Sequence, residues 1–176
     1  MKNVFKLMMV LMLLSVALVS CTKDSVTKKS EIVYNSTSYE LSKGYLESDG
    51  QTSSTSGIYY YVLMLTSKNV TVDIANLQFG GTGNGLIFEL FTSSSTDISD
   101  GTYNFESTNA INTFDLGLVI MDYDWTTLKK SAIGARITSG TVKVAKSGTN
   151  YEVTLDATVT GGSKVTAYYN GTLVKY

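Results

Sequence analysis

Apolar side chains recur at every second position through much of this chain, and this alternation limits it to folds built from β-strands. Successive side chains of a strand point to opposite faces, so alternation predicts one core face and one solvated face. Beyond residue 30, long segments with the 3.6-residue period of a helix are lacking, and the fold class is therefore predicted to be all-β. In the clearest case, "YEVTLDATV", one alternate set is apolar: Tyr151, Val153, Leu155, Ala157 and Val159.

Turn signals divide the chain into about nine or ten predicted strands. "GTVKVAK" runs into the turn "SGTN", and "TGGS" separates "YEVTLDATV" from "KVTAYYNGTL", which predicts a C-terminal antiparallel meander. Upstream, "EIVYNSTSYEL" predicts a hairpin turning at residues 35–38, and "GIYYYVLMLTS" predicts a strand that is apolar on both faces. "NVTVDI" places Val70, Val72 and Ile74 on one side. Closely spaced strands without helices indicate an antiparallel barrel, which has no exposed edges, with a two-sheet sandwich as the alternative.

Residues 1–20 have the three parts of a secretory signal peptide. Lys2 and Lys6 give a positive start, "LMMVLMLLSVALV" is an apolar middle, and the small Ser20 ends the segment. A comfortable transmembrane helix needs about 20 apolar residues, more than this run offers. The segment is therefore predicted to be a signal helix that is removed from the mature protein.

Cys21 follows this signal directly and is the one cysteine of the 176-residue chain. Leu18, Ser20 and Cys21 form an aliphatic-x-small-Cys pattern that resembles the lipobox of bacterial lipoproteins. That resemblance implies a diacylglycerol joined to the sulfur, cleavage before Cys21, and a protein held in the membrane by two or three acyl chains. An incidental cysteine in an ordinary signal peptide is the alternative.

The segment 21–30, with the sequence "CTKDSVTKKS", is polar and charged, and we expect a lipidated flexible tether leading to one all-β domain at 31–176. Thr22 stands where bacterial lipoproteins of the inner membrane commonly have Asp. By that resemblance, the protein is expected at the outer membrane, on either its periplasmic or its cell-surface face. Without the signal, 12 basic and 15 acidic residues leave a net charge of −3. So weak a charge argues against a nucleic-acid partner.

Three stretches resemble small β-rich lipoproteins common in Bacteroidota, some of which have lipocalin-like or calycin-like barrels. They are "YELSKGYLESDG", "DGTYNF" and "SGTVKVAKSGTNYEVTLDATVTGGSKVTAYYNGTL". The likeness covers most of the mature chain and consists largely of turn glycines and strand alternation. It implies a location and a fold class, and it implies no activity.

The chain has no histidine, and its one thiol is predicted to be acylated. A Ser-His-Asp or Cys-His nucleophile system cannot be assembled, and imidazole ligands for metals are missing. We therefore predict no catalytic residues, no cofactor and no metal site. Asp122 and Asp124 are a pair of side chains with a spacing that could suit catalysis or metal binding. A regular strand would place them on one face about 6–7 Å apart. That spacing suits a glycosidase pair, a calcium site, or two solvated acids.

Aromatic residues give the remaining functional hint. Tyr60, Tyr123 and Trp125 are the candidate ligand contacts, since such rings stack on sugars or anchor protein contacts, although they also fill β cores. The predicted function is a membrane-anchored envelope lipoprotein whose non-catalytic β domain binds a glycan, a small apolar ligand or an envelope protein. The alternatives are a carboxylate-dependent glycan hydrolase that uses Asp122 and Asp124, and a structural or adhesive surface subunit.

Overall fold

The computed structural model describes residues 28–51, 57–76, 78–127 and 134–176. Within these ranges the chain forms β-strands and one 3-10 helix, η1 (Trp125–Thr127), so the all-β prediction is confirmed. The predicted signal helix, Cys21 and most of the tether lie outside the described residues. No helix in the described ranges is long and apolar enough to cross a membrane.

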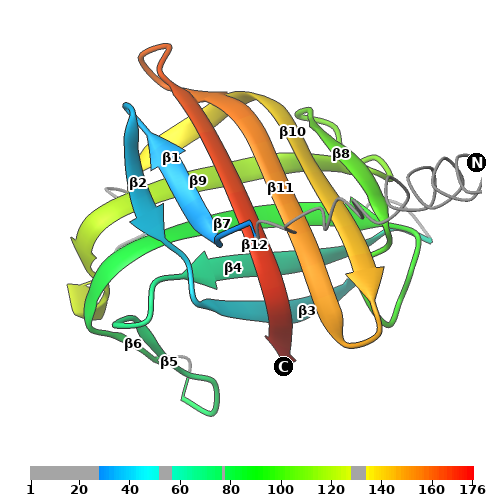
Figure 1. Cartoon of the computed structure of the whole chain (residues 1–176). Helices are drawn as coiled ribbons and strands as arrows, with labels where there is room; N and C mark the ends of the chain where they lie inside the picture. The colour runs from blue at the N-terminus through cyan, green and yellow to red at the C-terminus, as the bar shows by residue number, and fades with distance from the viewer. Residues whose placement is uncertain (1–27, 52–56, 77, 128–133) are drawn as a thin grey trace, which may run out of the picture.

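Ten strands form one large sheet, and two short strands form a separate hairpin (Figure 1). The strands of the large sheet are β1 (Glu31–Tyr34), β2 (Thr37–Glu40), β3 (Lys43–Gln51), β4 (Tyr59–Thr66), β7 (Thr82–Thr92), β8 (Gly101–Phe105), β9 (Thr113–Asp124), β10 (Ala135–Ser147), β11 (Asn150–Val159) and β12 (Lys164–Lys175). The hairpin consists of β5 (Thr71–Asp73) and β6 (Gln78–Gly80).

Both hairpin predictions are confirmed. β10, β11 and β12 form the expected antiparallel meander, and β1 pairs antiparallel with β2. The β1–β2 turn is tighter than the predicted 35–38, because Asn35 and Ser36 alone connect the strands. Both have positive φ, 48° and 62°, which is the backbone of a type I′ turn and a conformation that Asn tolerates well.

The prediction of a wholly antiparallel sheet is wrong, because two pairs of strands run parallel. β12 pairs parallel with β3, with Leu173 opposite Gly44, and β8 pairs parallel with β9, with Asn104 opposite Thr113. In the first case, β1 runs antiparallel to β12, and the β1–β2 turn reverses the chain. The chain therefore runs in the direction of β12 when β3 pairs with it. In the second case, the connection at residues 106–112 loops back so that β9 starts beside the last two residues of β8 and runs in the same direction.

The order of pairing curls the large sheet round on itself. From β12 the neighbours run through β3, β4, β7, β9, β8 and β10 to β11, and β11 pairs in turn with β12 (Figure 1). One face of the sheet thus becomes an interior. The alternation in "YEVTLDATV" is confirmed here, because its five apolar residues are buried while Glu152 and Asp156 are exposed.

Apolar side chains pack throughout this interior. Leu63, Leu65, Phe88, Val142 and Leu155 are each at most 1% exposed and belong to one contiguous cluster. Phe88 and Phe114 meet edge to face, with ring centroids 6.0 Å apart. The interior is thus built from the inward residues of nearly every strand, in agreement with the period-two pattern.

A second apolar cluster lies on the outer face and explains why β4 is apolar on both sides. Met64 faces outward and stands opposite Tyr45 on β3 and Ile87 on β7, and Ile87 stands opposite Leu118 on β9. All four residues belong to the outer cluster, in which Val70, Ile120 and Trp125 are each 0% exposed. Val70, Val72 and Ile74, the predicted one-sided set near β5, pack into the same cluster.

Candidate functional site

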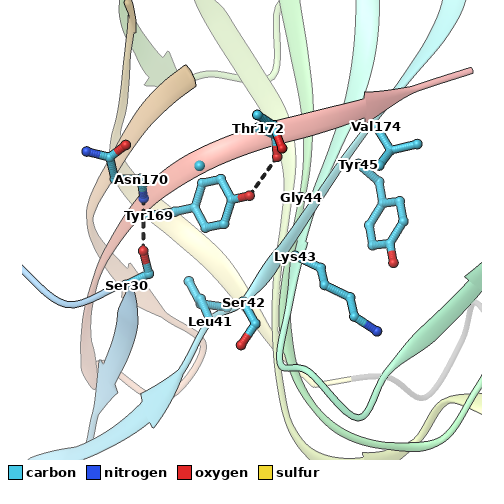
Figure 2. A pocket seen from close by; sticks show the side chains of 11 residues that line it. Ser30, Leu41, Ser42, Lys43, Gly44, Tyr45, Tyr169, Asn170, Thr172 and Val174 are labelled. Carbon is cyan, nitrogen blue, oxygen red and sulfur yellow. Dashed lines mark hydrogen bonds between the residues drawn. The ribbon is translucent and has the colours of Figure 1, made fainter. Parts of the chain in front are cut away.

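β12 leaves an opening between its two neighbours on one side. β1 pairs with residues 165–168 of β12, and β3 pairs with residues 173–175. In the pairings of the described strands, residues 169–172 have no strand on that side. A hollow of about 390 Å³ lies at this opening (Figure 2).

The walls of the hollow combine hydroxyl, amide and aromatic groups with a few apolar side chains. They contain one ammonium group and no carboxylate. The lining residues are Ser30, Leu41, Ser42, Lys43, Gly44, Tyr45, Tyr169, Asn170, Gly171, Thr172 and Val174. Such a mixture suits a small neutral molecule that carries many hydroxyl groups.

The Tyr169 ring fills the space that two glycines leave. A Cβ on Gly44 would lie 2.9 Å from the Tyr169 hydroxyl oxygen, and one on Gly171 would lie 2.7 Å from the same atom. The hydroxyl donates a hydrogen bond to the Thr172 carbonyl oxygen at 2.7 Å (Figure 2). Burial raises the pKa of Tyr169 to about 12, with a smaller contribution from the nearby Tyr45. The phenol is therefore a neutral donor at physiological pH.

Other wall residues also have local partners. The Ser42 hydroxyl donates to the Glu40 carboxylate at 2.8 Å, and the Asn170 side-chain amide donates to the Tyr168 hydroxyl oxygen at 3.3 Å. The Ser30 hydroxyl accepts a hydrogen bond from the backbone N–H of Asn170 at 2.9 Å. The Lys43 ammonium donates to the Val70 carbonyl oxygen at 2.7 Å, and its side chain points away from Tyr169 (Figure 2). This charge is thus directed at the β4–β5 connection, and the Glu40 carboxylate, which Ser42 contacts, lies outside the lining. The exposed side chains of Asn170 and Thr172 are left at its rim.

The three aromatic residues singled out from the sequence lie elsewhere and do not form one site. Tyr60 is half-buried, donates to the Asp49 carboxylate and packs on Phe91. Tyr123 is half-buried and donates to the Thr127 carbonyl oxygen at 3.3 Å. Their cross-strand partners on β7 are Phe91 and Gly83, which a strand separates by about 26 Å.

Trp125 is fully enclosed by protein atoms. Its side chain is 0% exposed, and Nε1 donates to the Gly83 carbonyl oxygen at 3.2 Å. The ring lies against Gly85, where a Cβ would be 2.7 Å from Cζ2. The Trp125 ring thus lies in the outer apolar cluster. This position corresponds to the alternative that the ring packs in a β core.

Asp122 and Asp124 do not sit on a regular strand. The pairing of β9 with β7 shifts its register between Gly83 and Gly85, and Asp122 has a φ of 46°, so the two-residue alternation is interrupted there. Both side chains are exposed. Asp124 accepts hydrogen bonds from the hydroxyl and the N–H of Thr126, which lower its pKa. The regular strand on which the same-face spacing depended is therefore interrupted at Asp122.

Asp97 anchors a loop in a way that the sequence did not reveal. It lies in the β7–β8 connection, and its Oδ2 accepts from the Tyr151 hydroxyl at 2.6 Å, from Lys175 Nζ at 2.9 Å and from Lys146 Nζ at 3.4 Å. The next residue, Ile98, is 0% exposed in the interior cluster. A lone isoleucine in the polar run "TSSSTDISD" was the one available signal. No group of three or more His, Cys, Asp or Glu suited to a metal ion occurs in the described part of the chain.

The chain was compared with protein-family models, with curated proteins and with solved structures, and no match was found in any of the three. The function therefore has to be argued from the chain's own residues.

Proposed function

We propose that this protein is a lipid-anchored component of a bacterial envelope whose non-catalytic β domain binds a small glycan in the hollow between β1, β3 and β12. The domain is proposed to be a lipocalin-like or calycin-like barrel. The return of the strand pairings to β12 supports this architecture over a sandwich of two separate sheets.

The chemical groups that line the hollow support a glycan as its ligand. A sugar ring offers hydroxyl groups on its edge and C–H groups on its faces, and Asn170, Thr172 and Ser42 supply amide and hydroxyl groups, while the exposed Val174 supplies apolar surface. A volume of about 390 Å³ lies at the lower end of the range for small-molecule pockets, which favours a ligand of one or two sugar rings.

The packed interior argues against the small apolar ligand that lipocalin-like barrels can enclose. The inward positions of β4, β7 and β11 are filled by side chains that contact one another, and these side chains exclude solvent almost completely. A guest molecule would have to displace them. The outer hollow is already open and needs no such rearrangement. For the hydrolase alternative, the bulge at Asp122 and the separate engagement of Asp124 provide no support.

Glycan binding is expected to weaken when the rim of the hollow is filled. Thr172→Tyr adds a ring at the rim, and we expect a loss of affinity of about tenfold or more, because displaced ligand groups lose contacts worth over 1.4 kcal/mol. The chain starting at Thr22 is applied to a glycan array, and the affinity for positive sugars is measured by calorimetry. Thr166→Tyr is the matched control, an exposed threonine on the same strand outside the hollow. Equal affinity of the two variants would contradict the assignment of the hollow, and a silent array would reject glycan binding.

Membrane attachment is expected to depend on the sulfur of Cys21. In cells fed a labelled fatty acid, wild-type protein should carry label and sediment with membranes, because acyl chains joined to Cys21 hold it there. Cys21→Ala should be unlabelled and appear in the soluble fraction of the envelope. An unlabelled wild-type protein would refute the anchor.

A further inference from the structure

The predicted tether ends in the wall of the hollow. Ser30 lines the hollow and accepts the hydrogen bond from Asn170 on β12. Two residues earlier, the Lys28 ammonium lies over the Tyr168 ring, 4.1 Å from its centroid. These two contacts place residues 28–30 along β12 from Asn170 to Tyr168, so the first described residue of the tether lies beside the hollow. The anchor therefore holds the domain at the side on which the hollow opens.

The length of the tether limits how far that side can be from the bilayer. Cys21 precedes Lys28 by seven residues, which reach at most about 25 Å when fully extended. A flexible chain of that length has an average end-to-end distance of about 15 Å. A domain of this size has a radius of gyration of about 15 Å as well. The hollow is thus held close to the lipid, and the opposite side of the domain is held farther away.

We infer that the hollow is turned towards the bilayer that carries the anchor and takes the sugar headgroup of a membrane glycolipid. This inference depends on the proposed lipid anchor and on the proposed glycan site. A neutral headgroup matches these walls, because no carboxylate lines the hollow and its one ammonium group, that of Lys43, is directed to the Val70 carbonyl oxygen. A soluble glycan would gain nothing from a site placed against a membrane, whereas a lipid-linked sugar is concentrated there.

The orientation is tested without any ligand. Val174 at the hollow and Ile111 in the β8–β9 connection are the matched positions, 47% and 45% exposed. Each is changed to cysteine in the full lipidated chain, in which acylated Cys21 offers no competing thiol, and each is labelled with a fluorophore in phosphatidylcholine vesicles. Energy transfer to a headgroup-labelled lipid is expected to be higher for Val174→Cys, because Val174 lines the hollow and Ile111 does not, and roughly twofold or more higher where the two label heights above the bilayer differ by about one domain radius. Equal transfer, or stronger transfer for Ile111→Cys, would overturn the inference.

The ligand source is tested with a lipid-linked form of the array-positive sugar. Vesicles carrying the lipidated protein are mixed with separate vesicles carrying this lipid, and light scattering reports aggregation. A hollow that faces its own membrane cannot reach a second vesicle, so no aggregation is expected, while binding to the lipid in the same vesicle should remain and be lost in Thr172→Tyr. Inserting a flexible segment of about 20 residues after Thr22 should release the domain and produce aggregation.

These outcomes separate the inference from the proposed function. Aggregation by the protein with its native tether would show an outward-facing hollow and overturn the inference, while leaving glycan binding intact. A silent array would reject the proposed function, and the energy-transfer measurement would still decide the orientation.

Discussion

Replacing Trp125 with alanine is expected to lower the free energy of unfolding by about 3–5 kcal/mol. The ring is 0% exposed and forms the centre of the outer cluster, which also contains Met64, Val70 and Ile120. It packs on Phe79 of the β5–β6 hairpin, with centroids 6.1 Å apart. Alanine would leave a cavity between this hairpin and the large sheet, and the Gly83 carbonyl oxygen would lose the hydrogen bond from Nε1.

The measurement is urea unfolding followed by circular dichroism, because the variant removes the one tryptophan of the chain. Trp125→Phe should cost less than Trp125→Ala, since much of the buried apolar surface is kept. Tyr123→Phe is the control, because it removes only a half-exposed hydroxyl whose hydrogen bond to Thr127 is 3.3 Å long, with an expected loss below about 1 kcal/mol. A Trp125→Ala protein as stable as this control would contradict the packing role. If Trp125 serves in packing and does not contact the ligand, Trp125→Phe should bind the glycan with the affinity of the wild-type protein.

Replacing Asp97 with asparagine is expected to cost about 1–3 kcal/mol at pH 7. The carboxylate accepts from Tyr151, Lys146 and Lys175, and its side chain is 19% exposed. The lysine side chains are 30% and 47% exposed, so solvent weakens both ion pairs and the expected loss is below that of a fully buried pair. The loss should loosen the β7–β8 connection, which Ile98 otherwise ties into the interior.

The contribution of Asp97 is expected to depend on pH. Burial by itself raises the pKa of this carboxyl, but the hydrogen bonds from Tyr151 and Lys175 and the charge of Lys146 outweigh burial, and the net pKa is lowered. A lowered folded-state pKa stabilises the protein above the unfolded-state value of about 3.9, and this stabilisation is lost as the pH falls through the folded-state value. The stability difference between wild type and Asp97→Asn should therefore be smaller at pH 3 than at pH 7.

Asp122→Asn is the matched control for this experiment. Its side chain is exposed, and asparagine tolerates the positive φ at this position, so stability should change by less than about 0.5 kcal/mol. A pH-independent difference between wild type and Asp97→Asn would show that the carboxylate charge contributes nothing.

Local alternation was sufficient to predict the strands but insufficient to predict their partners. Tyr151, Val153 and Leu155 share a face in any strand, so their burial followed from the period of two alone. The parallel contact between Leu173 and Gly44 joins segments far apart in the chain, and no local pattern specifies it. The two-sided apolar character of β4 was visible in the sequence, whereas the outer cluster in which Met64 is buried was not.

The candidate site shows the same division. Tyr60, Tyr123 and Trp125 attracted attention as exposed-aromatic candidates because a sequence does not distinguish a ring in a core from a ring at a surface. Tyr169 is one of the chain's many tyrosines and lies with Asn170 in an ordinary alternating strand, so the sequence did not single out these two residues as a site. They became part of a hollow because β1 and β3 pair with different stretches of β12 and leave residues 169–172 between them.

By itself, the sequence determined the strand-forming segments, the tight turns and the all-β class, because these depend on side-chain period and backbone preference over a few residues. It also supplied the prediction of an anchored envelope protein, through Cys21 and the segment before it. Only the tertiary structure decided which strands are neighbours, that Asp97 binds two distant lysines, that Trp125 is enclosed, and where the sheet leaves a hollow. Each of these depends on contacts between residues separated by long stretches of chain, and those contacts exist only after the sheet has curled round on itself.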